Sequence, residues 1–490
     1  MKGNEKMEKT SNELKRELFY IPDNAALSCS DEEIATADTF CEGYKAFLDN
    51  AKTEREAVLT TIELCKKNGF SEYDPTVKYA AGDKVYYNNR SKALILAVFG
   101  SESLENGVKI AAAHIDSPRL DLKPSPLYES NDLALFKTHY YGGIKKYQWV
   151  AIPLALHGVV AKKDGTTVNI TIGEKEGEPK FVISDILPHL GAEQAKRSLN
   201  EGIKGEELNV LVGSRHYKGK DLDSDSRSVI KLAGTTFGLG ESSLVKLNVL
   251  KILNDKYGIT ERDFLSAELE VVPAFKADDI GFDRSMVGGY GHDDKVCAYP
   301  AVMAAINIKD PVHTVLTVLA DKEEIGSEGN TGLVSAFMKN FIYRIAASVD
   351  LEGYDVLSKS ECVSADVNAA YDPTFSDVFE AKNASFINRG VVVTKYTGAR
   401  GKSGTNDASA EFMGKMRRIL DDKGIVWQIG ELGKVDAGGG GTVAKYISQL
   451  DVDVVDIGVP VLSMHAPYEV ISKLDLYMAY RAFFEFFAAE

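Results

Sequence analysis

The spacing of apolar residues divides the chain into three stretches of different character. Residues 1–122 carry helical stripes at 30–50 and 53–68, each marked by a capping signal at one end, and then short apolar strands. Residues 123–274 show the alternation of β-strands, and residues 275–490 return to apolar strands that are each followed by a turn or helix signal. This order predicts an α/β protein whose main domain is interrupted by a β-rich insertion.

Individual elements follow from the same pattern. Strands before the insertion are predicted at 84–87, 92–99 and 110–114. Within the insertion we predict a hairpin of 159–163 with 167–172, a mobile polar stretch at 214–228, a helix at 241–257 and a strand at 267–272. After it we predict a helix at 296–306, strands at 314–320, 345–350, 391–395, 426–430 and 454–462, and an aromatic-rich helix at 474–489.

The strand that ends at His114 organises the rest of the interpretation. Its small apolar residues stop abruptly at His114 and Asp116, as in a buried parallel strand whose carboxyl end opens into a crevice of an α/β sheet. Residues two apart in an extended strand point to the same side, so Asp116 can accept a hydrogen bond from the His114 ring. A metal-bound imidazole needs such a partner. A His-x-Asp pair alone is more often an ordinary polar strand end.

The third stretch supplies further candidate ligands, mostly after predicted strands. They are Asp293 with Asp294, Glu323 with Glu324, Asp366 and His465. Adjacent carboxylates repel each other unless cations hold them, and one of a pair can bind metal while its neighbour acts as the general base. Two histidines, several carboxylates and no thiolate suit two zinc-class ions bridged by a carboxylate and a water.

Composition narrows the classes of protein that remain. A chain of 490 residues with 44% hydrophobic and 26% charged residues predicts two or three ordinary globular domains. Five dispersed cysteines favour a reducing cytoplasm over a disulfide framework. A net charge of −15 without a basic stripe opposes a nucleic-acid partner, and no apolar run approaches the roughly 18 residues of a membrane span.

Together these motifs resemble the aspartyl aminopeptidase family of dinuclear zinc metallopeptidases. The resemblance is carried, in family order, by Ala113–Pro118, Asp293-Asp294, Asp321–Ser327, Ser364-Ala365-Asp366, and Ser463-Met464-His465 with Glu469. It implies a mixed-sheet zinc-peptidase catalytic domain with helices on both faces, formed by 1–122 and 275–490. It also implies that 123–274 is an inserted dimerisation domain, and that dimers assemble into a tetrahedral dodecamer.

The resemblance assigns a role to individual residues. His114 and Asp366 would bind one metal ion, Glu324 and His465 the other, and Asp293 would bridge them. Glu323 would be the base, and Asp116 would orient a ligand. Both ions would be zinc, with manganese or cobalt as alternatives. In the family a histidine from a neighbouring subunit completes the site, and the segment 183–190 makes His189 the candidate for that substrate contact.

The chain departs from the family in the segments that line the substrate side of the site in that family. Residues 368–372 read Asn-Ala-Ala-Tyr-Asp where the family usually has histidines, and the block 395–406 also differs. Lys395, directly after an apolar strand, is the candidate for binding an acidic N-terminal side chain.

We therefore expect an enzyme that hydrolyses N-terminal residues, with Asp and Glu as candidates, from peptides by means of a metal-bridging water and a Glu base. The alternatives are a broad-specificity, deblocking or glutamyl-type aminopeptidase, or a non-catalytic assembly protein. The presence of Glu323 beside the full ligand set argues against the last of these.

Overall fold

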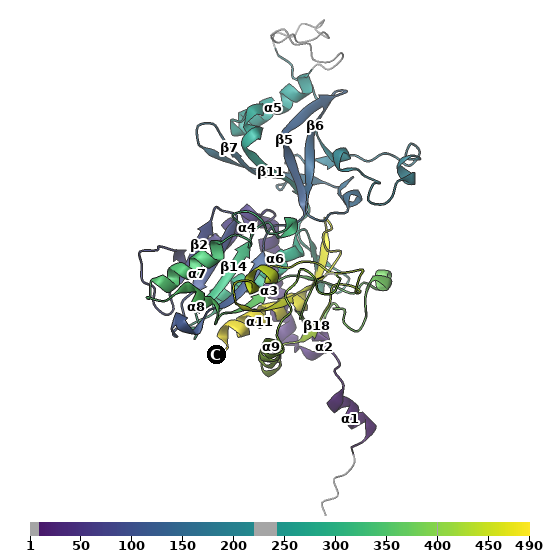
Figure 1. Cartoon of the computed structure of the whole chain (residues 1–490). Helices are drawn as coiled ribbons and strands as arrows, with labels where there is room; N and C mark the ends of the chain where they lie inside the picture. Colours follow the sequence, from purple (N-terminus) through teal and green to yellow (C-terminus); the bar gives the residue numbers. More distant parts are fainter. Residues whose placement is uncertain (1–8, 220–242, 399) are drawn as a thin grey trace, which may run out of the picture.

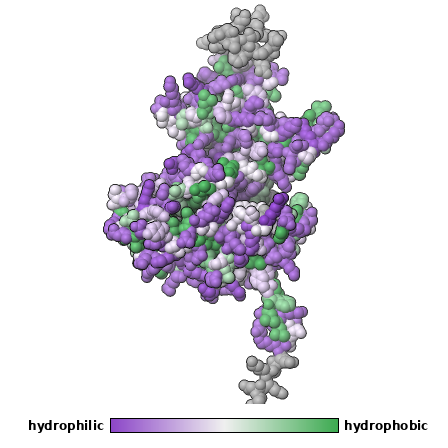
Figure 2. Space-filling model, viewed as in Figure 1, coloured by the Kyte–Doolittle hydropathy of each residue, from purple (hydrophilic) through white to green (hydrophobic). Residues whose placement is uncertain are grey.

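Two bodies, each built on its own large sheet, make up the molecule (Figure 1). The computed structural model describes residues 9–219, 243–398 and 400–490. The visible face of both bodies is mostly hydrophilic, with scattered hydrophobic patches (Figure 2). Within the described ranges, no helix is long and apolar enough to cross a membrane.

A nine-stranded mixed sheet forms the larger body. Its strands lie in the order β1 (Ser71–Glu72), β2 (Lys84–Asn89), β3 (Ala93–Val98), β14 (Val315–Ala320), β4 (Lys109–His114), β15 (Glu361–Ser364), β19 (Asp453–Gly458), β17 (Val391–Thr394) and β18 (Trp427–Ile429). The central strands β14, β4, β15 and β19 are mutually parallel. Their carboxyl ends therefore meet at one edge, where α/β sheets place ligands.

Helices cover both faces of this sheet, because successive strand residues point to opposite sides. On β3, Leu94 and Leu96 join one hydrophobic cluster while Ile95 joins the other. The first cluster is completed by α3 (Asp31–Asn50), α4 (Glu54–Lys67), α6 (His292–Asn307), α9 (Ala410–Asp422) and α11 (Lys473–Ala488). The second is completed by α7 (Phe337–Ala347), α8 (Gly353–Leu357) and α10 (Ala444–Ser448). The predicted α/β class with a mixed sheet is confirmed.

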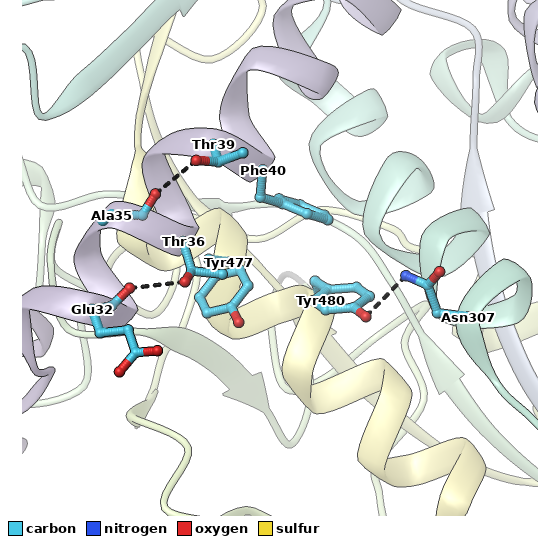
Figure 3. Close-up of a pocket in the computed structure, with 8 residues that line it drawn as sticks. All are labelled: Glu32, Ala35, Thr36, Thr39, Phe40, Asn307, Tyr477 and Tyr480. Atoms are coloured by element: carbon cyan, nitrogen blue, oxygen red, sulfur yellow. Dashed lines mark hydrogen bonds between the residues drawn. The ribbon is translucent and has the colours of Figure 1, made fainter.

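The last helix has the broad aromatic face that the sequence predicts. Phe483, Phe486 and Phe487 of α11 are fully buried. Tyr477 and Tyr480 instead line a surface groove between α3, α6 and α11 (Figure 3), where Asn307 donates a hydrogen bond to the Tyr480 hydroxyl at 3.0 Å. The face is thus divided between the core and a partly open aromatic surface.

A separate, fully antiparallel sheet forms the second body. Its seven strands lie in the order β8 (Thr167–Ile172), β7 (Leu154–Ala161), β11 (Ala267–Pro273), β5 (Arg119–Ser130), β6 (Leu133–Tyr141), β10 (Asn209–Gly213) and β9 (Val182–Ile183). Helix α5 (Leu244–Tyr257) packs against this sheet. All its strands come from residues 119–273; the predicted boundaries 123–274 and the dimerisation role of this part stay predictions.

A small third sheet has five strands. It consists of β12 (Asp278–Ile280), β13 (Met286–Gly289), β21 (Glu469–Ser472), β20 (Pro460–Leu462) and β16 (Asn368–Ala369). The remaining helices are α1 (Ser11–Leu18), α2 (Ala25–Ser28) and the 3-10 helices η1 (Leu104–Asn106), η2 (Lys146–Trp149), η3 (Gln194–Lys196), η4 (Gly205–Glu207), η5 (Glu261–Ser266), η6 (Glu323–Ile325) and η7 (Pro373–Val378).

Two predicted strands differ from the structure. The strand predicted at 345–350 is wrong, because Phe337, Phe341 and Ile345 are buried at the four-residue spacing of one helix face and belong to α7. The strand predicted at 454–462 is broken at Val459, so its halves β19 and β20 lie in two different sheets. Of the polar stretch predicted as mobile, 214–228, residues from 220 onward lie outside the described residues, as does the start of the helix predicted at 241–257.

Candidate metal centre

Three parallel strands deliver candidate residues to one edge of the large sheet. His114 is the last residue of β4, and Glu323 and Glu324 form η6 shortly after β14. Asp366 follows the end of β15 by two residues. Because the three strands are neighbours with their carboxyl ends at the same edge, residues far apart in the sequence converge there.

The small third sheet brings the other two candidate ligands. Asp293 lies at the start of α6, just after β13, and His465 lies in the turn between the paired strands β20 and β21. Ser463 and His465 have φ angles of 57° and 65°, in the left-handed region that residues other than glycine rarely adopt. This tight turn carries the imidazole of His465 back toward Asp293.

Asp293 is shared by two clusters of candidate ligands, and each of its two carboxylate oxygens faces a different histidine. Its Oδ1 is 3.1 Å from His114 Nε2, and its Oδ2 is 3.2 Å from His465 Nε2. Asp366 Oδ1 lies 3.8 Å from His114 Nε2, and Glu324 Oε1 lies 3.6 Å from His465 Nε2. In each cluster the three ligand atoms lie within 4.8 Å of one another. The structure thus brings the five proposed ligands together in two groups that share Asp293. One group contains His114 and Asp366, and the other contains Glu324 and His465.

The electrostatics of these groups fit two bound cations. Burial raises the pKa of Glu324 and of Asp366 well above the usual range, and neighbouring carboxylates add to the effect. Burial alone would lower the pKa of His465, but its hydrogen bond to Asp293 and the charge of Glu324 raise that pKa to about 10. Glu324 Oε1 is also buried without a hydrogen-bond partner. Cations would satisfy these acceptors, and the nitrogen and oxygen donors suit zinc-class ions.

Asp116 lies against the His114 ring through two of its oxygen atoms. The His114 Nδ1 lies 3.0 Å from the backbone carbonyl oxygen of Asp116 and 3.4 Å from its carboxylate Oδ1. Its carboxylate also accepts hydrogen bonds from the backbone N–H groups of Glu323 at 3.1 Å and Glu324 at 3.2 Å. Asp116 therefore fixes the chain that carries the candidate base.

Glu469 holds the backbone of two candidate ligands, as Asp116 holds the backbone of Glu323 and Glu324. The buried carboxylate of Glu469 accepts hydrogen bonds from the backbone N–H of Asp293 at 3.1 Å and of His465 at 2.7 Å. Burial raises the pKa of this carboxyl group to about 8. The sequence placed Glu469 in a motif without a role. The available signal was an acidic residue that opens a short strand four positions after a candidate ligand.

Lys295 is a second residue that sequence reasoning missed. Its fully buried ammonium group donates to Ser117 Oγ at 2.6 Å, and that hydroxyl donates to the Asp293 carbonyl at 2.7 Å. The available signal was a lysine that directly follows Asp293-Asp294 and directly precedes the predicted apolar helix at 296–306.

Two predicted substrate-binding residues lie apart from this cluster. His189 is exposed in the loop between β9 and η3, and no contact links it to the cluster within the described part of the same chain. Lys395 follows β17, which runs antiparallel to β19 and so leads away from the edge where Asp366 lies. Its Nζ donates to Asp407 Oδ1 at 2.6 Å.

Comparisons with known proteins agree on one family. The profile described as "Aminopeptidase I zinc metalloprotease (M18)" matches residues 47–487. A curated "Probable M18 family aminopeptidase 1" from Clostridium acetobutylicum is 47% identical, over 93% of this chain and 95% of its own length. The protein of the same description from Thermotoga maritima is 44% identical, over 91% of this chain and 96% of its own length.

Solved structures give the same result for the fold. A crystal structure of an M18-family aminopeptidase from Thermotoga maritima superposes with a TM-score of 0.86 at 42% identity, covering 96% of this chain and 99% of that one. The S. cerevisiae mApe1 dodecamer gives a TM-score of 0.72 at 17% identity, covering 92% and 97%, which is a likeness of fold alone.

Metal binding at this site is expected to release protons. In the metal-free site the His465 pKa of about 10 keeps the imidazole protonated at pH 7, and a protonated ring nitrogen cannot bind metal. The apparent affinity for Zn²⁺ should therefore rise with pH, by up to about tenfold per pH unit for each proton displaced. Calorimetric titration in two buffers of different ionisation enthalpy measures the protons released.

The control for this experiment is the exposed His139, which lies in the second body. His139→Ala should leave the proton release unchanged, whereas His465→Ala should lower both the release and the number of ions bound. Zinc binding that is independent of pH between 6 and 8 would contradict a ligand role for His465.

Proposed function

Because this chain belongs to the M18 family of zinc metallo-aminopeptidases, we propose that it removes N-terminal residues from peptides, with Glu323 as the general base. The observation that carries the proposal is the pair of clusters that share Asp293. Glu323 lies beside them without belonging to either: its Oε2 is 4.0 Å from His114 Nε2. A carboxylate next to a two-ion site, and not needed as a ligand, is free to move a proton.

The proposed ligands form two sets, one for each metal ion. His114 with Asp366 would hold one divalent ion, His465 with Glu324 the other, and Asp293 both. Zinc is the metal of the family, and manganese and cobalt are the alternatives. Ions of this class, when bound, polarise a carbonyl oxygen and lower the pKa of a neighbouring water.

Glu323 has the properties that a general base needs near neutral pH. Its side chain is 18% exposed, so a substrate can reach it. Burial raises the pKa of Glu323 to about 7, and the charges of Asp116 and Asp293 act in the same direction. A carboxylate with that pKa can take a proton from the attacking water and pass it to the leaving amine. The excess of carboxylates at the site would also attract the positively charged N-terminus of a peptide.

Replacing the base should separate chemistry from metal binding. We expect Glu323→Gln to retain both ions and the assembly while kcat falls roughly 10²- to 10⁴-fold, because the amide cannot accept the proton. Chromogenic aminoacyl substrates measure kcat, and elemental analysis measures the metal content. Glu328→Gln, an exposed glutamate in the same loop, is the control and should match the wild type. Near-normal turnover of Glu323→Gln with two bound ions would rule out this role.

We also propose that the chain forms homo-oligomers, as dimers that assemble into a tetrahedral dodecamer, with His189 reaching a neighbour's site. The segment that carries His189 leaves hydrophobic side chains exposed in the single chain: Ile186, Leu187, Leu190 and Leu199. Such side chains are normally covered by another surface. One solved protein with this fold is itself described as a dodecamer.

Mixed assemblies would test the contact between subunits. Glu323→Gln and His189→Ala are each expected to be inactive, and reassembling the two proteins together should restore part of the activity. Some sites would then combine an intact base with an intact histidine from the partner. His139→Ala alone is the control for the loss of an exposed histidine and should keep the wild-type activity. Full activity of His189→Ala alone would refute the contact.

Substrate preference has two candidates, and each has an observation in its favour. Lys395 and Lys402 share a single carboxylate, Asp407, so the loop has excess positive charge that favours an acidic N-terminal residue. Broad specificity is favoured by the position of Lys395 after β17, away from the edge that carries Asp366. A deblocking or glutamyl-type activity uses the same proposed ligands.

All five cysteines are free, which supports a reducing compartment such as the cytoplasm.

A single substitution distinguishes these preferences. If Lys395 binds an acidic side chain, Lys395→Ala should lower kcat/KM for substrates with N-terminal Asp or Glu by about tenfold or more, and change little for Leu or Ala. Lys402→Ala is the matched control for the loss of one positive charge. Equal cleavage of Leu and Asp substrates by the wild type, or an equal loss for both in the variant, would establish the broad-specificity enzyme.

A further inference from the structure

The end of β6, a strand of the second body, reaches the proposed metal centre at two points. The Tyr141 hydroxyl donates a hydrogen bond to Asp116 Oδ2 at 2.9 Å. Two residues later, the Gly143 carbonyl oxygen lies 3.1 Å from His465 Nδ1 and accepts its hydrogen. We infer that the segment Tyr141–Gly143 is a positioning element that fixes His465 directly and Glu323 and Glu324 through Asp116. This inference rests on the ligand set of the proposed function.

Tyr141 is held rigidly from the side of the antiparallel sheet. Its ring faces Arg119, which lies directly opposite it in the pairing of β5 with β6, and the guanidinium carbon is 4.0 Å from the ring centroid. Arg119 is itself buried and paired with Asp121 at 2.9 Å and Glu270 at 3.3 Å. The phenol is therefore fixed by residues of the second body while its hydroxyl points into the site of the first.

The hydroxyl completes the set of donors around Asp116. Oδ2 of Asp116 accepts from Tyr141 and from the Glu324 N–H, and Oδ1 accepts from the Glu323 N–H. Without the hydroxyl, this fully buried carboxylate would lose one donor and its defined orientation, which costs free energy and loosens the chain it holds. The position of Glu323 therefore depends on Tyr141 through Asp116.

The two glycines allow the backbone to approach the site closely. Gly142 has a φ of +76°, and a Cβ there would come within 3.1 Å of Glu324 Oε2. A Cβ on Gly143 would come within 3.1 Å of His465 Nδ1, the atom that donates to the Gly143 carbonyl. That hydrogen bond keeps the proton of a neutral imidazole on Nδ1 and leaves Nε2, which faces Asp293, as the free nitrogen.

The two histidines of the centre are thus oriented in the same way from two different bodies. His114 Nδ1 lies against the carbonyl of Asp116, just after β4 of the large sheet, and His465 Nδ1 lies against the Gly143 carbonyl of the segment leaving β6. Because partners of this kind set the orientation of a metal-binding imidazole, the antiparallel sheet contributes to metal affinity without supplying a ligand.

Tyr141→Phe removes the hydroxyl and keeps the ring against Arg119. We expect zinc affinity, measured by competition with a chelator, to weaken about 10- to 100-fold, and kcat at saturating zinc to fall by a similar factor with KM within about twofold. The control is Tyr140→Phe, because Tyr140 is the exposed neighbour on the same strand. Wild-type zinc affinity and kcat in a folded Tyr141→Phe protein would overturn the role of Tyr141.

Gly143→Ala tests the second contact and remains decisive if Tyr141→Phe fails to fold. It should weaken zinc affinity at least tenfold while the circular dichroism and the size of the assembly stay unchanged. Gly205→Ala is the control, because a Cβ there meets only the Tyr140 ring at an ordinary 3.4 Å. Wild-type affinity in Gly143→Ala would overturn the positioning of His465. A wild-type protein that binds no zinc would instead overturn the proposed function and, with it, the ligand set on which this inference rests.

Discussion

Repulsion among buried carboxylates is the constraint on which the centre of this molecule depends. Asp293, Glu324 and Asp366 converge at the edge of the large sheet with two imidazoles between them, and their three carboxyl groups are largely buried. Burial opposes the charge on Glu324 and on Asp366, and neighbouring carboxylates oppose it further. On Asp293, hydrogen bonds from the two imidazoles outweigh burial and lower the pKa of the carboxyl group. Such an arrangement is stable only where protons or cations neutralise it. A site that concentrates ligands in this way is therefore prepared for metal.

The surrounding chain holds these groups in place through backbone hydrogen bonds. Asp116 accepts two N–H groups from η6, and Glu469 accepts the N–H groups of Asp293 and His465. Each of these two acids binds backbone and leaves the side chains of its neighbours free to face the centre. Because the fixed groups lie on strand ends and tight turns, the proposed ligands need little rearrangement to bind an ion.

The two bodies of the protein share one site. The antiparallel sheet begins at Arg119, only five residues after His114, and β6 pairs antiparallel with β5, so β5 starts and β6 ends beside the centre. Tyr141 and Gly143 use that proximity to contact Asp116 and His465. The second body can therefore influence chemistry at the first even though it supplies none of the proposed ligands. The same body carries the exposed segment around His189. An assembly formed through that segment would therefore be connected to the geometry of the site.

The sequence by itself determined the α/β class, most of the elements and the residues proposed as ligands. These features are local: strand alternation, caps and polar residues at the ends of apolar runs are visible within a few positions, and the motifs have a characteristic order. It failed at 345–350, where an apolar run is compatible with a strand or with one face of a helix, and only packing of Phe337 and Phe341 against the sheet decides.

Only the tertiary structure decided what surrounds the proposed ligands. The roles of Glu469, Lys295 and Tyr141 each depend on a hydrogen bond to a residue at least 25 positions away in the chain. No local pattern records such contacts, because they arise when three sheets meet at one edge. The position of Lys395 followed from the antiparallel direction of β17, which the residues of that strand do not reveal. Strand direction is set by the partners of a strand, and those partners are chosen only when the whole sheet forms.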